Sequence, residues 1–326
     1  MSPHTLEEQL TSYLTDAHAI ERQALAQLRH APKIAGDEAL AAILRVHEAE
    51  TERHERLVRE RLEAHGASPS RVKDAVMEAG GIGFVLFAGA QADTPGKLAA
   101  HAYSYEHLEL AAYELLARVA ELAGDADTVA VARAIRDEEA TMARRIEATF
   151  DGVVAASLQA GREHDPAKLL DVYLADAHAL EEQALGLLDK AVEIGGPPEL
   201  TRAYAEHLEE TRGHVEAVER RLAERGASPS KLKDAALRLG AINWGAFFAA
   251  QPDTPGKLAA FAFAFEHLEI AGYEQLARVA RAAGDPETVA VAERILREER
   301  AAAGHVADSF DLAVTGSLAA LGVATA

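Results

Sequence analysis

The chain has 326 residues, with 53 acidic against 33 basic side chains, a formal net charge of −20 and no cysteine. A chain of this length can bury two ordinary hydrophobic cores. The negative charge opposes binding to phosphate backbones and to anionic lipids, so we expect neither nucleic acid nor a membrane as a partner. Without cysteine, a metal site would have to use histidine and carboxylate ligands.

The N-terminus lacks the layout of a signal peptide. Every apolar stretch also falls short of the roughly 18 residues of a membrane-spanning helix. Both features predict a cytoplasmic protein.

The sequence repeats itself without a gap at an offset of 160 residues, from Tyr13 to Tyr173. The segment at Tyr13 reads YLTDAHAIERQAL, and the segment at Tyr173 reads YLADAHALEEQAL. In the same register, QADTPGKLAA returns as QPDTPGKLAA, and YEHLELAAYELLARVA returns as FEHLEIAGYEQLARVA. A period of this length corresponds to a whole domain and not to a solenoid repeat. We therefore expect two copies of one domain, 1–161 and 162–326, with a polar junction near residues 161–166.

Apolar residues recur three and four positions apart, which is the spacing of amphipathic helices. In the first copy, helices are expected at 5–29, 37–65, 94–124, 127–150 and, as a short apolar segment, 153–160. The short links between the first two and the last two long helices predict antiparallel hairpins. The long middle link, with a candidate short helix at 70–78, can cross the length of a bundle, as in ferritin-like folds. The expected fold is all-α, with two tandem ferritin-like four-helix bundles.

Charged side chains interrupt the apolar stripe of each long helix near its middle. The positions that face inward are Glu21 in the first helix, His47, Glu50, Thr51 and His54 in the second, Glu106 and Glu109 in the third, and Glu139 in the fourth. Burying several ionised carboxylates together is costly without partners, and it adds mutual repulsion. A pair of divalent or trivalent cations would neutralise them, as in di-iron and di-manganese carboxylate proteins.

The second copy carries the same side chains 160 residues later. They are Glu181, His207, Glu210, Thr211, His214, Glu266, Glu269 and Glu299. Neighbouring positions differ, for example Arg45 against Ala205 and Arg53 against Gly213. Since copies can diverge where nothing constrains them, the shared set predicts two equivalent sites.

Several segments resemble the ferritin-like family typified by YciE and YciF. In the second copy they are AHALEEQ at 177–183, HLEETRGHVE at 207–216, EHLEIAGY at 266–273 and the pair Glu298-Glu299. The resemblance implies a ferritin-like bundle, a carboxylate-bridged centre with two iron or manganese ions per copy, an association with bacterial stress and a tendency to dimerise. A tandem chain can supply that dimer covalently, so we expect a monomer with an internal pseudo-dimer, or a homodimer.

The resemblance also implies which residues bind the ions. It assigns one ligand to each helix, namely Glu21, Glu50 as the bridging ligand, Glu109 and Glu139, with counterparts Glu181, Glu210, Glu269 and Glu299. Glu106 and Glu266 resemble the additional carboxylate of rubrerythrin-like sites. Tyr113 and Tyr273, four residues after the second glutamate of the third helix in each copy, are expected to pack in the core; the alternative is that they donate hydrogen bonds at the site.

The histidines depart from the usual pattern of di-iron proteins. That pattern places histidine three residues after the glutamates of the second and fourth helices, but here Arg53 and Met142 follow Glu50 and Glu139 at that spacing. The remaining candidates, as ligands or as hydrogen-bond partners of the carboxylates, are His47, His54, His207 and His214.

Three functions from different classes agree with this site. The first is an oxidase with a di-iron or di-manganese centre that acts on ferrous ion or peroxide. The second is a protein that sequesters iron or another divalent cation without turnover. The third is a metal-free stress or interaction protein, in which networks of glutamate and histidine replace the ions.

Overall fold

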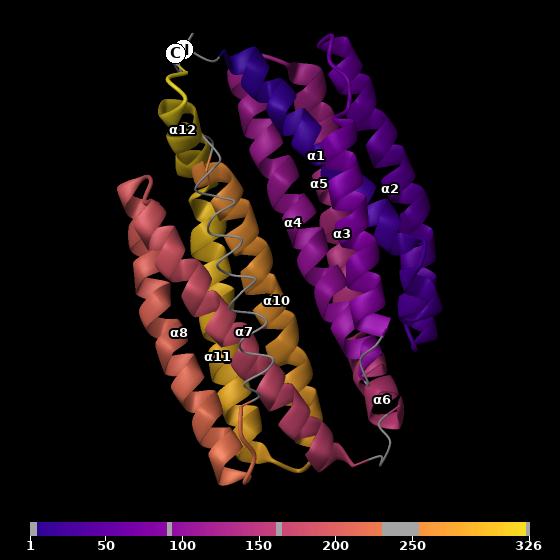
Figure 1. Cartoon of the computed structure of the whole chain (residues 1–326), viewed down its shortest axis with the longest axis vertical. Coiled ribbons are helices and arrows are strands. Elements are labelled where there is room, and N and C mark those ends of the chain that lie inside the picture. The colour runs from indigo at the N-terminus through magenta and orange to yellow at the C-terminus, as the bar shows by residue number, and fades with distance from the viewer. Residues whose placement is uncertain (1–4, 90–92, 161–164, 230–253, 324–326) are drawn as a thin grey trace. The chain divides into compact units, whose positions relative to one another are not determined.

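Helices form every regular element in the part of the chain that the structure, a computed structural model, describes (Figure 1). The described residues are 5–89, 93–160, 165–229 and 254–323. The chain divides into two compact units, one of Met1–Ala160 with Leu318–Ala326 and the other of Gly161–Ser317. Among the described helices, none is both long and apolar enough to cross a membrane. The prediction of an all-α protein with two helical domains is confirmed.

The helices of the first copy lie close to their predicted ranges. They are α1 (Leu6–Leu28), the short 3-10 helix η1 (Ala31–Lys33), α2 (Glu38–Ala64), α3 (Arg71–Gly89), α4 (Thr94–Ala123), α5 (Ala126–Glu147) and α6 (Phe150–Ala160). Helix α1 packs against α2 and α4, and α5 closes the bundle by packing against α4 and α2. Four long helices therefore surround one core, with α3 against α1 and α6 against α4.

Local signals determine where these helices begin and end. The hydroxyl of Thr5 accepts a hydrogen bond from the backbone N–H of Glu8, whose carboxylate accepts one from the N–H of Thr5. Asp37 caps α2 by accepting a hydrogen bond from the N–H of Leu40 at 2.8 Å. Gly124 ends α4 with a φ of 74°, a left-handed conformation that glycine adopts without steric cost. Such caps satisfy backbone groups that a helix end leaves unpaired.

The link between α2 and α4 differs from its prediction. The sequence predicts a short helix at 70–78, but α3 continues to Gly89 with three glycines in its interior. At Gly81, a Cβ would lie 2.8 Å from the backbone oxygen of Gln23 and 3.2 Å from Cγ of Gln27, both on α1. Gly81 therefore allows two helices to approach closely, a role that the sequence pattern does not distinguish from that of a turn.

Replacing Gly81 with alanine is expected to lower the free energy of unfolding by about 1–3 kcal/mol, because the methyl group would push α3 away from α1. Gly83 is the matched control, since a Cβ there would meet no described atom within 4 Å. Gly83→Ala should stabilise the protein by up to about 1 kcal/mol, because alanine has the higher helix propensity. Chemical denaturation measures both effects, and equal stability of the two variants would contradict the close approach.

The described part of the second copy repeats the bundle. Its helices are α7 (Pro166–Ile194), α8 (Pro198–Glu224), α10 (Thr254–Ala282), α11 (Pro286–Asp308) and α12 (Phe310–Ala320). Helix α7 packs against α8 and α10, and α11 packs against α10 and α8. The boundary predicted between 161 and 162 lies outside the described residues.

Candidate metal centre

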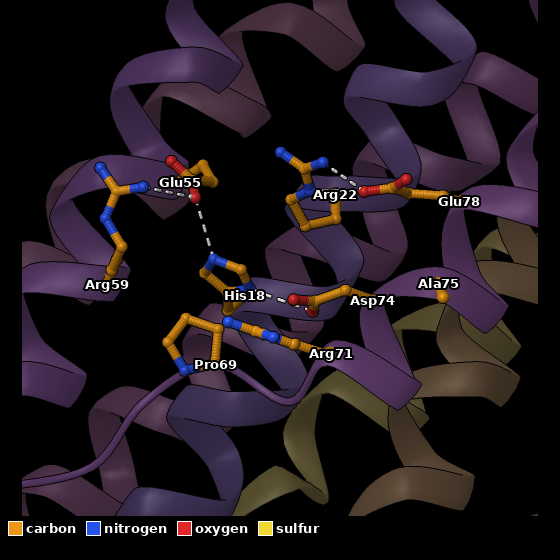
Figure 2. A pocket seen from close by; sticks show the side chains of 9 residues that line it. All are labelled: His18, Arg22, Glu55, Arg59, Pro69, Arg71, Asp74, Ala75 and Glu78. Atoms are coloured by element: carbon orange, nitrogen blue, oxygen red, sulfur yellow. Dashed lines mark hydrogen bonds and ion pairs between the residues drawn. The ribbon is translucent and has the colours of Figure 1, made fainter.

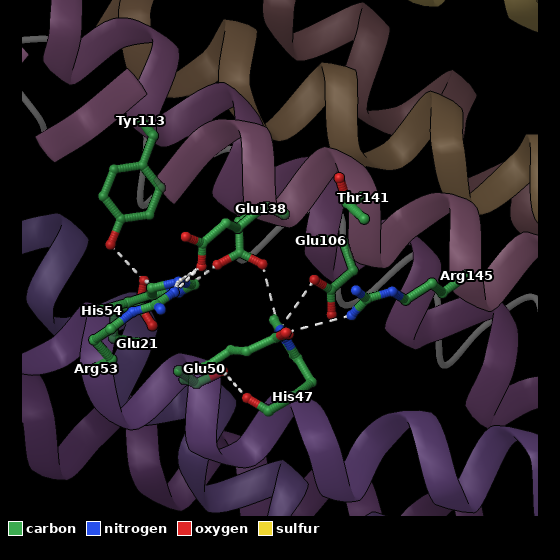
Figure 3. A network of polar contacts seen from close by, with 12 residues as sticks. Glu21, His47, Glu50, Arg53, His54, Glu106, Tyr113, Glu138, Thr141 and Arg145 are labelled. Atoms are coloured by element: carbon green, nitrogen blue, oxygen red, sulfur yellow. Dashed lines mark hydrogen bonds and ion pairs between the residues drawn. The ribbon is translucent and has the colours of Figure 1, made fainter. Parts of the chain in front are cut away.

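Six buried polar side chains from four helices meet in the core of the first copy. They are Glu21 from α1, His47 and His54 from α2, Glu106 and Glu109 from α4, and Glu139 from α5. A spacing of seven residues places both histidines on one face of α2, and a spacing of three does the same for the glutamates of α4. Each of these residues is at most 4% exposed. Figure 3 shows four of them in the space between the helices, Glu21, His47, His54 and Glu106.

The six side chains form two groups that share Glu139. The groups are His47, Glu106, Glu109 and Glu139, and Glu21, His54 and Glu139; the candidate ligand atoms of each lie within 4.8 Å of one another. Nε2 of His47 lies 3.3 Å from Oε2 of Glu139 and 3.3 Å from Oε2 of Glu106. Nδ1 of His54 lies 2.8 Å from Oε1 of Glu139. The two oxygens of Glu139 therefore face different sets of ligands, as those of a bridging carboxylate do.

Many atoms of these groups have no hydrogen-bond partner among the described residues. They are both carboxylate oxygens of Glu109 and Glu139, Oε2 of Glu21 and Glu106, Nε2 of His47 and Nδ1 of His54. The contacts of Glu139 with the histidines have the distance of an ion pair but not the geometry of a hydrogen bond. A buried polar group left unsatisfied costs about 1–3 kcal/mol, so this many at one point is unusual for a stable core.

A pair of divalent cations would satisfy these atoms. Four carboxylates and two imidazole nitrogens form a donor set that iron and manganese accept. The four carboxylate charges equal the charge of two divalent ions, so the buried centre would be neutral as a whole. The residues therefore fit two such ions, one for each group.

Each histidine is oriented by a carboxylate farther from the centre (Figure 3). His47 donates a hydrogen bond from Nδ1 to Oε2 of Glu50 at 3.0 Å. His54 donates one from Nε2 to Oε2 of Glu138 at 2.8 Å. These partners assign the tautomers and leave the other nitrogen of each ring facing the inner carboxylates. An outer carboxylate that fixes the ring in this way is typical of metal-binding histidines.

Glu50 lies outside both groups, although the sequence resemblance implies a bridging ligand at this position. Its carboxylate accepts hydrogen bonds from His47 and from Arg145 of α5. Glu139 holds the shared position instead. The reason is the direction of the side chain, which leaves α2 toward α5 and solvent. Glu210 likewise belongs to neither group of the second copy.

Two residues outside the predicted set of ligands contact side chains of the two groups. Glu138 orients His54, and it also binds Arg53. A glutamate recurs at the equivalent position of the second copy, Glu298, and this recurrence was the sequence signal for the role of Glu138. Tyr113 donates its hydroxyl hydrogen to Oε1 of Glu21, so it does more than pack. Its place four residues after Glu109 allows such a donor, but the spacing of a buried tyrosine is the same whether or not its hydroxyl has a partner.

Burial raises the pKa values of three carboxylates of the first copy. It raises the pKa of Glu21 to about 8, although attraction to His54 opposes the shift. It raises the pKa of Glu106 to about 7 against the attraction of His47. Burial and repulsion by the other carboxylates raise the pKa of Glu109 well above its ordinary value. Without cations, these groups therefore bind protons near neutral pH.

The pKa shifts of the histidines favour their charged form. Burial lowers the pKa of His54, but interactions with Glu139 and Glu21 outweigh this effect and raise it to about 9. For His47, burial also acts downward, and Glu106 and Glu139 again outweigh it, so its pKa lies well above the ordinary value. Burial would raise the pKa of Glu139, but both histidines hold it well below its usual range. Without cations, Glu139 is therefore ionised beside two protonated histidines.

The second copy contains the same inner groups. They are His207, Glu266, Glu269 and Glu299, and Glu181, His214 and Glu299. Nε2 of His207 lies 3.0 Å from Oε2 of Glu266 and 3.3 Å from Oε2 of Glu299. Nδ1 of His214 lies 2.9 Å from Oε1 of Glu299. The shared glutamate is therefore the same in both copies.

The outer contacts of the second copy follow the first as well. His207 donates from Nδ1 to Oε2 of Glu210 at 3.1 Å. His214 donates from Nε2 to Oε2 of Glu298 at 2.9 Å. Tyr273 donates its hydroxyl hydrogen to the glutamate of α7 at 2.5 Å. Two copies that differ at many surface positions thus agree in the inner contacts and in the carboxylates that orient the histidines.

A polar cavity of about 320 Å³ lies between α1, α2 and α3 (Figure 2). Its lining residues are His18, Arg22, Glu55, Arg59, Pro69, Arg71, Asp74, Ala75 and Glu78. His18 bridges Glu55 at 2.9 Å and Asp74 at 3.1 Å, and Arg22 binds Glu78. These ion pairs satisfy each other and tie α3 to the bundle, so the lining resembles a structural network more than a second reactive site.

A protein-family model matches the chain twice, over residues 5–159 and 165–318. The family is described as "Domain of unknown function (DUF892)". No solved structure matches the chain significantly. The two matches agree with the repeat in the sequence and with the two copies of the buried centre. The chain therefore belongs to the DUF892 family and contains two tandem copies of its domain.

Proposed function

We propose that each copy binds two divalent cations, iron or manganese, in the two groups that share a glutamate. In the first copy the ligands would be His47, Glu106, Glu109 and Glu139 for one ion, and Glu21, His54 and Glu139 for the other. In the second copy they would be His207, Glu266, Glu269 and Glu299, and Glu181, His214 and Glu299. The observation that carries this proposal is the set of unsatisfied buried nitrogen and oxygen atoms, which recurs atom for atom in both copies.

We further propose that the centre belongs to an oxidase that acts on ferrous ion or peroxide. A bound pair of iron or manganese ions supplies redox chemistry that the side chains lack. The chain itself would bind the ions, keep bulk water away from them and hold both at the carboxylate of Glu139. The resemblance to YciE and YciF supports a role in bacterial stress. A cytoplasmic location and the pairing of the copies as a pseudo-dimer stay predictions from the sequence.

Elemental analysis of the purified protein after anaerobic loading with ferrous or manganous ion tests this function. We expect one ion for each of the four groups. Further ferrous ion added in air should then consume oxygen. Stoichiometric metal without oxygen consumption would favour sequestration over catalysis. A chain that binds no metal under any loading condition would contradict both.

A second candidate, the metal-free stress or interaction protein, is favoured by one observation. Each histidine of the first copy lies within 2.8–3.3 Å of an oxygen of Glu139, and both histidines have raised pKa values. Two protonated histidines could therefore replace the ions permanently. In that case excess manganous ion would leave the melting temperature unchanged at pH 6 and pH 8, because a ligand that does not bind cannot stabilise.

Replacing Tyr113 with phenylalanine is expected to weaken cation binding in the first copy by roughly 10- to 100-fold, because Glu21 loses the hydrogen bond that orients it. Competition titration with a chromophoric chelator measures the affinity, in a chain whose second centre is removed by Glu299→Ala. Tyr105→Phe is the matched control, since that buried hydroxyl donates to the backbone oxygen of Ile20 and not to a carboxylate. Unchanged affinity in Tyr113→Phe would mean that the tyrosine only packs.

A further inference from the structure

The two centres differ at the glutamate that orients the first histidine. In the first copy, Oε1 of Glu50 accepts a hydrogen bond from Arg145 at 3.4 Å, and the Glu50 side chain is 27% exposed (Figure 3). In the second copy, His305 stands where the arginine would be, and the Glu210 side chain is 53% exposed. The contact that Glu210 makes within the described residues is with His207. Glu210 therefore presents to solvent a carboxylate that no described arginine or lysine neutralises.

The other outer glutamate keeps an arginine in both copies. Glu138 binds Arg53 of α2, whereas Glu298 binds Arg294 of α11 at 2.7 Å. The second copy has Gly213 at the position of Arg53, and the first copy has Ala134 at the position of Arg294. In the second copy, α8 lacks this arginine, and Arg294 of the facing helix α11 binds the outer glutamate instead. Of the four outer glutamates, Glu210 is therefore the one without a basic partner among the described residues.

Glu210 also connects solvent with the buried ligands of the second centre. It is bonded to His207, whose other ring nitrogen faces the inner carboxylates, and His207 is only 6% exposed. Gly213 lies three residues after Glu210, and Gly304 lies next to His305. Glycine in a helix interior costs stability relative to alanine. Outside its own stretch of helix, no described atom lies within 4 Å of the Cβ that either glycine lacks, so packing among the described residues does not require them.

We propose that Glu210 is the entry ligand through which a divalent cation reaches the second centre, and that Arg145 blocks the equivalent route into the first. The proposal rests on the proposed function, because it presupposes that both centres bind cations. A cation bound by Glu210 would be separated from the inner carboxylates by His207 alone. It would enter between α8 and α11.

At the first centre, the same route passes the guanidinium group of Arg145. This group repels a divalent cation, and it already occupies one oxygen of Glu50. Repulsion over about 4 Å, even in bulk water, slows passage by roughly tenfold or more. The second centre is therefore expected to fill before the first.

Stopped-flow mixing of the metal-free full-length chain with Co²⁺ tests the proposal, because the ligand-field absorbance of the ion reports binding. Single-centre chains separate the two rates: Glu299→Ala leaves the first centre, and Glu139→Ala leaves the second. We expect the second centre to load about tenfold faster or more, with a gap that narrows at about 1 M salt because ions screen the arginine. Equal loading rates at low salt would overturn the proposal.

Substitutions at the rim provide an independent test. Arg145→Ala should speed loading of the first centre about tenfold, whereas Arg145→Lys keeps the charge and the slow rate. His305→Arg should slow the second centre, and so should Glu210→Gln, which removes the charge but keeps an acceptor for His207. Arg133→Ala is the matched control, because this exposed arginine of α5 binds Glu121 and no residue of the centre. The proposal would be overturned if Arg145→Ala, His305→Arg and Glu210→Gln all left the loading rates unchanged.

The outcomes separate the entry route from the proposed function. If neither centre of the wild type binds Co²⁺, both hypotheses fail. If both centres bind but load at one rate, only the entry route fails. The number of ions bound at equilibrium should be the same in Arg145→Ala and in the wild type, and circular dichroism verifies that each variant is folded.

Discussion

Glu139→Ala is expected to remove both cations of the first copy and to leave both cations of the second. The reason is that its two oxygens face two groups of ligands. Glu109 belongs to one group, so Glu109→Ala should remove a single ion. Elemental analysis of desalted protein measures the loss, with four ions expected in the wild type, two in Glu139→Ala and three in Glu109→Ala.

Glu50→Ala is the matched control for this prediction, because Glu50 contacts His47 but belongs to neither group. It should retain both ions with an affinity lowered by roughly 10- to 100-fold. The metal-free Glu139→Ala chain should also be less stable by about 3–5 kcal/mol, since two buried histidines lose their anionic partner. Glu139→Gln keeps the shape and tests metal loss in a better folded chain. Loss of both ions from Glu50→Ala, with none from Glu139→Ala, would return the bridging role to Glu50.

Without bound cations, the free energy of unfolding is expected to fall as the pH rises from about 5 to 9. The folded pKa values of Glu21 and Glu106, about 8 and about 7, lie above the ordinary value of 4.5. Between these values the folded chain holds more protons than the unfolded chain, so a rise in pH favours unfolding. His54, with a folded pKa of about 9 against 6.5, adds a loss of the same sign above pH 6.5. The total loss of unfolding free energy over this range is on the order of several kcal/mol, because each pKa unit corresponds to about 1.4 kcal/mol.

Glu139 sets the acid side of the same profile. Its folded pKa lies below 4.5, so its stabilising contribution is present above that pH and is lost as the pH falls. Cations require the deprotonated ligands, so saturating manganous ion should raise the melting temperature more at pH 8 than at pH 6. Thermal melts with a chelator and with excess metal measure both effects. A metal-free chain whose stability rises from pH 5 to 9 would contradict the raised carboxylate pKa values.

The sequence alone was sufficient to predict the two helical domains and the six buried polar side chains that meet in each candidate centre. Helical periodicity is a local property, so apolar residues three and four apart indicate helices before any packing is known. Thr5 and Gly124 likewise mark helix ends through contacts with their own neighbours in the chain. Glu21 and Glu139 could be predicted as buried because each interrupts an apolar stripe, where an ionisable side chain has to face the core.

Tertiary structure decided which carboxylate is shared between the groups and which faces solvent. At about 100° per residue, His54 lies about 20° from His47 around α2, whereas Glu50 lies about 60° away, at the edge of the buried face. The direction of an edge position depends on how α2 is rotated against α5, which no spacing within one helix determines. The same limit applies to Glu138, which reaches His54 from the other helix, and to Gly81, which contacts α1. Such contacts join residues far apart in the sequence, so they follow from the packing of the helices and not from the pattern of any one of them.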